Sequence, residues 1–469
     1  MRLISFKTIV LIFTLAVTAG CLSPRADNDG DVSAESLCPD TSRPLGEVLD
    51  QVATDFGCTI IHDIVPPSQM LRDADFRIRP WSIRATLDAV LTPCGYEYSY
   101  SRSKNSYRVK YLGAYRMTPG EGAEMMEWLA SRWTDLEAWQ ARRDTLRSDI
   151  RHNLRLDVLP EHFDGGVILS EPRRYEGYSV QNIGLEILPG VWCSGSIFRP
   201  AAASEGPRPL MLNPHGHNQA GRSREQEQIR AAMWAQLGCY AVSWDMLGKG
   251  CQPYIDPRYH RTPMTQTYNV LCAMRLLDYM TAHEAIDSTR IGITGASGGG
   301  TQTMLVTAVD SRITLSIPAV MMSCYHNGGC PCESGTGVHF SGGRTNNVEI
   351  AALCAPNPML VISDGADWTA HNPDLEMPYL KRIYRLYGAE DQVQNAHFPD
   401  EGHDYGPSKR QAAYAFTARH WGLETAVEEA QAVVEPDSLL CVWGPGYSKL
   451  PHGAIRDPRT LASALGWKE

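Results

Sequence analysis

A serine held between glycines, directly after an apolar β-branched run, constrains this chain more than any other feature. Residues 290–293 read as a strand, Ser297 follows in the pattern G-x-S-x-G, and residues 301–306 read as a helix. This strand–turn–helix context predicts a sharp, strained turn that exposes the serine hydroxyl. Glycines suit such a turn because neighbouring backbones crowd it. A glycine-rich structural turn without chemistry is the alternative.

Short apolar runs alternate with helical stretches over residues 166–425. The strand-like runs include 209–212, 240–244 and 359–362, and a helical stretch between two of them bears Val270, Met274 and Leu277. Buried parallel strands read as continuous apolar runs, and their alternation with helices favours a sheet covered on both faces. We therefore expect a doubly wound, mostly parallel α/β domain over 166–425.

A serine hydroxyl is a weak nucleophile until a base takes its proton. When a serine lies on a strand-to-helix turn of this type, the acid and then the histidine follow it in the chain. His403 lies in a loop after the strand-like run 393–398, where its imidazole can reach the serine. His397 falls within that run and His420 within the last helix, so we expect structural roles for both. His403 is the predicted base.

Two aspartates compete for the position of the acid. Asp364 and Asp367 both follow the strand-like run 359–363, and a Gly-Ala turn at 365–366 separates them. The turn places Asp367 further out on the loop, which favours it as the partner of His403. The predicted triad is Ser297, Asp367 and His403.

Acyl transfer also requires hydrogen-bond donors for the developing oxyanion. The backbone N–H of Gly298, next to the serine, is one predicted donor. The loop at 213–218 follows the strand-like run 209–212 and can supply the second. We favour the N–H of His217, with that of Gly216 as second choice. A tight turn with no donor role is the alternative.

A few other polar residues could suggest a metal site or a structural role. Cys330 and Cys332, with His326, supply too few ligands, and C-x-C is not the spacing of an ordinary zinc site. We expect neither a metal nor a cofactor, and read this segment as a structural loop near the pocket. Asp245, after the strand-like run 240–244, is expected to be a structural loop residue.

The N-terminus has the pattern of a bacterial export signal. Arg2 and Lys7 precede an apolar run that is too short to span a membrane, and small residues lead to Cys21. Residues 1–20 are a predicted signal peptide and 21–37 a polar tether. The residues before Cys21 resemble a lipoprotein signal, which implies a lipid anchor there. Simple cleavage and release is the alternative; either way the protein is expected to be exported, to the periplasm or the outer membrane.

The charge balance excludes one class of partner. The formal net charge is −10, and no block of lysine and arginine stands out. Such a chain is not expected to bind nucleic acid. Any membrane contact is expected only through the lipid anchor. The chain has 13 cysteines, which suit disulfides in an oxidising compartment, but many lie in apolar runs typical of buried free thiols.

Residues 38–112 have the pattern of a small α+β module. A helix around Leu45 is expected, then strands at 59–61 and 76–79, a helix from Ile83, and a hairpin of 96–100 with 107–111. Residues 113–165 are expected to be a helical linker or cap, and 426–469 a tail without clear periodicity. With its segments 44–49 and 80–83, the module resembles the short N-terminal domain of secretins and TonB-dependent receptors. That resemblance implies docking to an envelope protein; a generic spacer is the alternative.

The catalytic half, about 140–425, resembles the bacterial α/β-hydrolases that include acetylxylan esterases and dienelactone hydrolases. The resemblance rests on residues 215–217, 244–246, 295–299, 345–349, 363–369 and 401–406. The resemblance implies an α/β-hydrolase fold and assigns nucleophile, acid and base to Ser297, Asp367 and His403. It implies an exported serine carboxylic-ester hydrolase that removes acetyl groups from a polysaccharide such as acetylated xylan. The alternatives are a prolyl-oligopeptidase-like peptidase, though no propeller domain is evident, and a non-catalytic envelope binding or scaffold protein.

Overall fold

A computed structural model describes most of the chain after residue 41. The described residues are 42–94, 96–101, 104–111, 117–201, 206–252, 254–424 and 429–467. The predicted signal peptide and tether, with the candidate lipidation site Cys21, lie outside them. Among the described residues, no helix combines the length and apolar character needed to cross a membrane.

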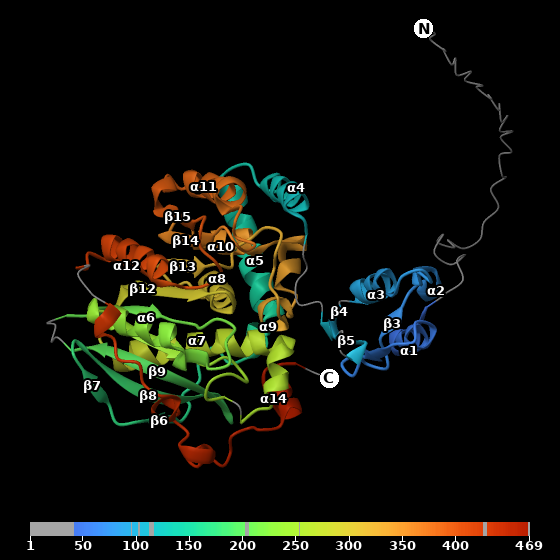
Figure 1. Cartoon of the computed structure of the whole chain (residues 1–469). Helices are drawn as coiled ribbons and strands as arrows, with labels where there is room; N and C mark the ends of the chain where they lie inside the picture. The colour runs from blue at the N-terminus through green and yellow to red at the C-terminus, as the bar shows by residue number, and fades with distance from the viewer. Residues whose placement is uncertain are drawn as a thin grey trace, which may run out of the picture.

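A ten-stranded sheet forms the centre of the larger part of the described molecule (Figure 1). Its strands pair in the order β15-β14-β13-β12-β10-β11-β9-β8-β6, and β7 pairs with β8. The strands are β6 (Val167–Leu169), β7 (Arg173–Tyr175), β8 (Tyr178–Leu188), β9 (Val191–Pro200), β10 (Arg208–Leu212), β11 (Tyr240–Trp244), β12 (Ile286–Ala296), β13 (Leu315–Ala319), β14 (Met359–Asp364) and β15 (Val393–Phe398). The strand-like runs of the catalytic half are therefore confirmed as strands.

The sheet divides into a parallel and an antiparallel part. From β15 to β11 all neighbouring strands run parallel. From β11 to β6 the neighbours run antiparallel. Parallel neighbours need crossover connections, here largely helical, whereas β8 and β9 form a hairpin. The predicted α/β-hydrolase fold class is confirmed.

Helices cover both faces of the sheet, as the residues of β10 show. Leu210 and Leu212 join one apolar core, and Met211 between them joins another. Side chains alternate across a strand, so these cores lie on opposite faces. The first core contains α7 (Pro263–His283), α8 (Gly298–Val309) and α11 (Met377–Leu386), and the second contains α6 (Glu225–Gln236) and α12 (Pro407–Trp421).

Two helices lie in the segment before the sheet. Helix α4 (Pro119–Ala130) and helix α5 (Leu136–Asn153) fill most of it. The apolar residues of α5 enter the same core as α7 and α8. Arg142 on α5 also pairs with Glu349 on α10 (Asn347–Ala351), at 2.5 Å between Nε and Oε1. This segment is thus packed against the sheet domain.

The N-terminal block has an apolar core of its own. Its elements are β1 (Arg43–Pro44), α1 (Leu45–Asp55), β2 (Thr59–Ile61), β3 (Met70–Leu71), α2 (Ala74–Arg77), α3 (Ile83–Leu91), β4 (Tyr96–Ser101) and β5 (Ser106–Tyr111). The first helix, the strand 59–61, the second helix and the hairpin are confirmed. A three-stranded sheet has the order β2-β5-β4.

The strand expected at 76–79 is wrong. Residues 74–77 form the short helix α2, and Phe76 is 78% exposed. The backbone N–H and C=O of Arg79 bond to the hydroxyl of Thr86, at 2.8 and 3.0 Å. Because a side chain on α3 pairs these groups, Arg79 does not need a strand partner, and the alternation of the sequence is misleading here.

The C-terminal tail packs against β7 and β9. Glu435 accepts hydrogen bonds from Arg173, and Trp443 lies edge-on to Trp192 at a ring distance of 6.1 Å. Its short helices are α13 (Asp437–Leu440) and α14 (Pro458–Ala464). Helices of one or two turns are held by tertiary packing, which explains why no periodicity marks them.

Candidate functional site

Ser297 occupies the sharp turn that the sequence predicts, between β12 and α8. Its backbone has φ 56° and ψ −122°, a strained conformation for a residue with a side chain. The neighbouring glycines are required because a methyl group at Gly295 or Gly299 would lie 2.4 or 2.6 Å from the carbonyl oxygen of Pro214. The turn therefore packs directly on the loop that follows β10.

Asp367 and His403 come together from two loops, after β14 and after β15. Nδ1 of His403 lies 2.5 Å from Oδ2 of Asp367. The other oxygen of Asp367 accepts from the backbone N–H and the hydroxyl of Thr369, both at 2.6 Å. Asp367 has 4% of its side chain exposed and His403 has 34%. A carboxylate next to Nδ1 keeps the ring proton of a neutral histidine on Nδ1. Nε2 of His403 is then the nitrogen that can accept a proton.

The ring of Trp368 covers one side of this pair. It lies 4.7 Å from the ring of His403 and stacks on His326 at 4.1 Å. Among the described residues, the hydroxyl of Ser297 makes no hydrogen bond in this structure. Contacts between a nucleophile and its base often tighten only when substrate binds.

The competing residues have other partners. Asp364 is buried and pairs with Nζ of Lys409 at 3.1 Å, and burial raises the pKa of its carboxyl. His397 lies on β15 and bonds the hydroxyl of Ser363 at 2.8 Å. His420 lies on α12, with its ring 4.4 Å from that of Phe416. Of the two aspartates, the structure brings Asp367 to His403.

The predicted oxyanion loop lies against the serine turn. A methyl group at Gly216 would come within 2.8 Å of the carbonyl oxygen of Ala296 and 3.6 Å of Cβ of Ser297. One at Gly298 would come within 3.0 Å of Cε1 of His217. The structure thus brings Gly216, His217 and Gly298 together around Ser297.

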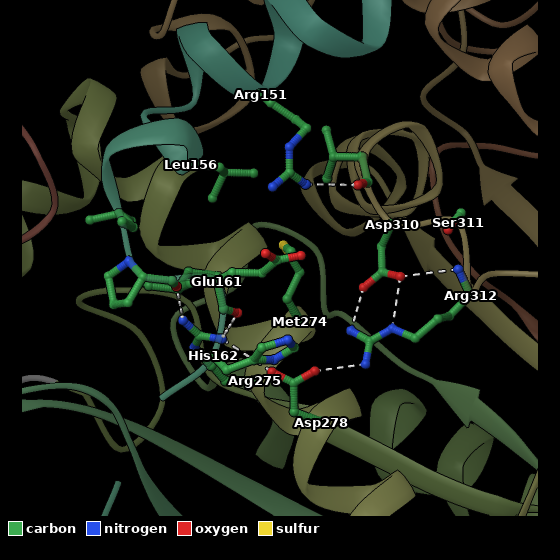
Figure 2. Close-up of a pocket in the computed structure, with 14 residues that line it drawn as sticks. Arg151, Leu156, Glu161, His162, Met274, Arg275, Asp278, Asp310, Ser311 and Arg312 are labelled. Atoms are coloured by element: carbon green, nitrogen blue, oxygen red, sulfur yellow. Dashed lines mark hydrogen bonds and ion pairs between the residues drawn. The ribbon is translucent and has the colours of Figure 1, made fainter. Parts of the chain in front are cut away.

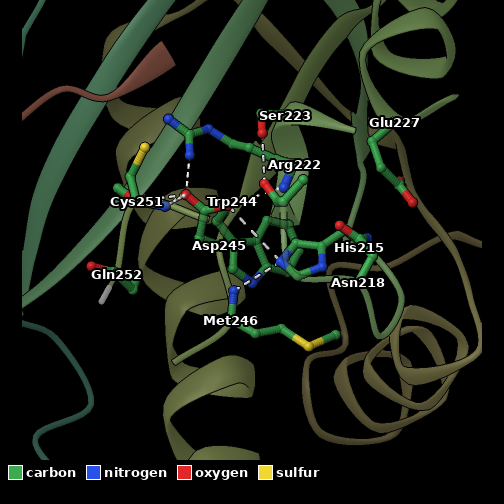
Figure 3. Close-up of polar contacts among 12 residues, drawn as sticks. His215, Asn218, Arg222, Ser223, Glu227, Trp244, Asp245, Met246, Cys251 and Gln252 are labelled. Atoms are coloured by element: carbon green, nitrogen blue, oxygen red, sulfur yellow. Dashed lines mark hydrogen bonds and ion pairs between the residues drawn. The ribbon is translucent and has the colours of Figure 1, made fainter. Parts of the chain in front are cut away.

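A buried aspartate behind this loop joins the segments that carry Arg222 and Cys251 (Figure 3). Asp245, at the end of β11, accepts hydrogen bonds from the backbone N–H groups of Arg222 and Cys251, both at 3.0 Å, and from the hydroxyl of Ser194 at 2.9 Å. It also pairs with the guanidinium of Arg222. All its contacts are within the fold, which agrees with the structural role expected for it.

His215 ties the oxyanion loop to the loop after β11. Its Nε2 accepts from the backbone N–H of Met246 at 3.0 Å, and its Nδ1 donates to the carbonyl of Gly216 at 2.7 Å (Figure 3). Complete burial lowers the pKa of His215. A neutral imidazole with one donor and one acceptor nitrogen satisfies both bonds.

A cluster of thiols and imidazoles flanks the other side of the turn, and sequence reasoning missed it. His217, His260, Cys330 and Cys332 have their ligand atoms within 4.8 Å of one another. Burial alone would lower the pKa of His217, but Glu333 and Cys330 outweigh it and raise the pKa to about 10. The sequence offered His326 as the companion of the cysteines, whereas this histidine stacks on Trp368. Only the fold joins the three segments that carry the cluster.

Two cavities differ in their relation to the site. One, of about 300 Å³, lies near the far end of α8, a 12-residue helix that begins after Ser297 and is roughly 18 Å long (Figure 2). Four of its charged side chains pair with one another: Arg312 bonds Asp310 and Asp278, both at 2.6 Å, and Arg275 bonds Asp278 at 3.2 Å. None of the predicted site residues lines this cavity.

The second cavity, of about 780 Å³, adjoins the thiol–imidazole cluster. Its lining includes His260 and Pro331 from the sheet domain and Arg108 and Lys110 from strand β5 of the N-terminal block. The N-terminal block therefore contributes to a hollow close to the candidate site.

No family model and no curated protein sequence matches this chain. Among solved structures, methylesterase BT1017 is similar to it, with 39% identity over 92% of this chain and 97% of that one, and a TM-score of 0.74. A glucuronoyl esterase from Solibacter usitatus matches 62% of this chain and 94% of its own at 14% identity, with a TM-score of 0.46. An acetyl xylan esterase from Paenibacillus sp. R4 matches 58% of this chain and 92% of its own at 18% identity, with a TM-score of 0.40.

Proposed function

Because the chain belongs to the family of methylesterase BT1017, we propose that it hydrolyses a carboxylic methyl ester through Ser297, Asp367 and His403. The observation that carries the proposal is the 39% identity over nearly the whole of both chains. The strained turn at Ser297 and the bond between His403 and Asp367 support the serine mechanism. A carboxylic-ester hydrolase is thus the enzyme class, and the methyl ester is the proposed substrate.

In the proposed reaction, Nε2 of His403 takes the proton of the Ser297 hydroxyl while Oγ attacks the ester carbonyl carbon. The N–H groups of Gly298 and His217 stabilise the oxyanion. The tetrahedral intermediate collapses, His403 protonates the leaving methoxide, and methanol departs from an acyl-enzyme. Water, activated by the same histidine, then attacks the acyl group and restores the serine.

In a methyl ester and in an acetyl ester, the large group lies on opposite sides of the bond that is cleaved. For a methyl ester the bulky group is the acid and remains on the serine as acyl-enzyme. For an acetylated polysaccharide the bulky group is the alcohol and departs first. Uronic acids are common carboxyl-bearing sugars of polysaccharides, so we propose a methyl-esterified uronic-acid polysaccharide as the substrate. Removal of acetyl groups from xylan stays as the second candidate.

The two candidates release different products. Purified protein is incubated with a methyl-esterified polyuronate and with acetylated xylan, and methanol and acetate are measured, with Ser297→Ala as the control. Methanol from the polyuronate, absent with the variant, is the expected result. Acetate without methanol would favour the second candidate. A peptidase would instead cleave peptide amides, and a scaffold protein would not react with a fluorophosphonate probe.

We also propose that the protein is exported and lipid-anchored through Cys21. The apolar run and small residues before Cys21 support this. One acyl chain binds membranes only marginally, so a stable anchor requires more than one. The variant Cys21→Ser should move the protein from the membrane to the soluble fraction of the cell envelope. An unchanged membrane fraction would contradict the anchor.

A further inference from the structure

Four potential metal ligands, two imidazoles and two thiols, converge beside the serine turn from separate segments of the chain. His217 belongs to the loop after β10, His260 to a short turn at Pro257–Arg261, and Cys330 and Cys332 to the segment that begins helix α9 (Pro331–Ser334). Their ligand atoms all lie within 4.8 Å of one another. In a tetrahedral zinc site with Zn–S of about 2.3 Å and Zn–N of about 2.0 Å, ligand atoms are roughly 3.3–3.8 Å apart. The cluster needs shifts on the order of 1 Å to reach that geometry.

His260 is oriented as a metal ligand would be. Its Nδ1 lies 2.9 Å from the carbonyl oxygen of Leu247 and donates to it, which leaves Nε2 with a lone pair. The residue is only 4% exposed, and within the described part of the chain Nε2 has no hydrogen-bond partner. Metal-binding histidines typically donate their other nitrogen to a carbonyl or a carboxylate in this manner.

His217 shows the same arrangement with a carboxylate. Its Nδ1 lies 3.1 Å from Oε1 of Glu333, which is 3% exposed, and its Nε2 lies 2.7 Å from Sγ of Cys332. Glu333 is fixed in turn, because its second oxygen accepts the N–H of Gly329 at 2.6 Å. Each histidine therefore directs one nitrogen at the cysteines and has the other held.

We propose that His217, His260, Cys330 and Cys332 bind one zinc ion in a closed, four-coordinate site. Two thiolates and two imidazoles form a donor set that favours zinc, and the thiolate charges balance the ion. Both cysteines are buried. With all four positions taken by protein, the ion has no place for a substrate or a reactive water, so its role is to position the protein.

The proposed zinc connects three loops around the serine turn. His217 is the predicted source of an oxyanion N–H, and its ring already lies against Gly298. Fixing this ring fixes the backbone next to it, so the ion would hold the oxyanion loop in place. This consequence rests on the proposed function, whereas the metal site itself does not.

The metal content of the purified full chain tests the site directly. The protein is expressed with added zinc, desalted, and analysed by elemental mass spectrometry, and X-ray absorption reports the ligands. We expect about one zinc per chain with sulfur at about 2.3 Å and nitrogen at about 2.0 Å. Cys332→Ser and His260→Ala should lose most of the zinc. Cys354→Ser, at a buried cysteine elsewhere, and His326→Ala should retain it.

Thiol labelling of the wild-type chain tests the metal site even if the variants do not fold. The peptide with Cys330 and Cys332 should resist alkylation until a zinc chelator is added. Alkylation at the same rate without chelator, a disulfide between the two cysteines, or zinc far below one per chain would overturn the proposal. Iron or copper in place of zinc would overturn the choice of metal. None of these measurements depends on ester hydrolysis, so failure of the metal site and failure of the enzyme assignment are distinguishable.

Discussion

The two sides of Ser297 differ in how the sequence encodes them. Asp367 and His403 each lie in a loop directly after a parallel strand, and the carboxyl ends of parallel strands meet at one edge of the sheet. The thiol–imidazole cluster comes from loops at 217, 260 and 330–332, whose paths depend on packing. Strand order thus specifies the first side, and only the folded loops reveal the second. Substitutions on each side should therefore have effects of different size.

The largest effect is expected at the residue between the two sides. Ser297→Ala removes the proposed nucleophile and should lower kcat by on the order of 10⁶. The measurement is turnover of a small aryl ester, with circular dichroism as the check on folding. A folded variant that keeps substantial turnover would contradict the assignment of Ser297.

The next effect separates the two aspartates of the acid–base side. Asp367→Asn should lower kcat by about 10⁴, because the amide no longer fixes the tautomer of His403. Asp364→Asn is the matched control. It removes one partner of Lys409, whose Nζ keeps Asp404 at 2.9 Å. We therefore expect a loss of about 1–3 kcal/mol in the free energy of unfolding but a kcat close to wild type. If Asp364→Asn had the lower kcat, the acid would need reassignment.

The side with the cluster should give a smaller kinetic effect. If zinc holds His217 in place, Cys332→Ser impairs at most one oxyanion donor, and the loss in kcat is bounded by about 10²–10³. Because substrate binding is not the function lost, KM should change little. A loss as large as that of Asp367→Asn would mean that the cluster takes part in the chemistry, and the positioning role would be wrong.

The sequence predicts the sheet well because burial on both faces leaves clear apolar runs. Residues 240–244 and 393–398 are strands with the bounds that the sequence predicts. The sequence-based prediction fails at 76–79, although the residues there alternate as in a strand. The hydroxyl of Thr86 pairs the backbone N–H and C=O of Arg79, which therefore needs no neighbouring strand. The prediction also paired the cysteines with His326, which is near them in sequence, instead of His217 and His260. Contacts between loops leave no periodic pattern, so this part of the site could not be predicted.

The smallest effect on the chemistry is expected for removal of the N-terminal block. Its apolar core is separate, and at roughly 75 residues it can fold alone only marginally. A chain that begins near residue 113 should keep its kcat on a small aryl ester. Loss of that turnover in a truncated protein with native circular dichroism would place the block in the catalytic unit.

A polymeric substrate should reveal a contribution of the N-terminal block to substrate binding that the small ester does not. Arg108 and Lys110 line the cavity of about 780 Å³ and pair with its carboxylates, Asp63 at 3.5 Å and Glu97 at 3.0 Å. The lining also has Lys249, Arg258 and Arg261, so its cations outnumber its carboxylates. A polyuronate exposes carboxylates wherever it is not esterified, and these would favour such a hollow. In the full chain, Arg108→Ala with Lys110→Ala should raise KM for the polyuronate severalfold, more strongly at low salt, and leave the aryl ester unaffected. The docking role that the resemblance to secretin domains implies would be favoured by two other results. The KM for the polymer would be unchanged in the double variant, and the truncated chain would no longer capture envelope proteins.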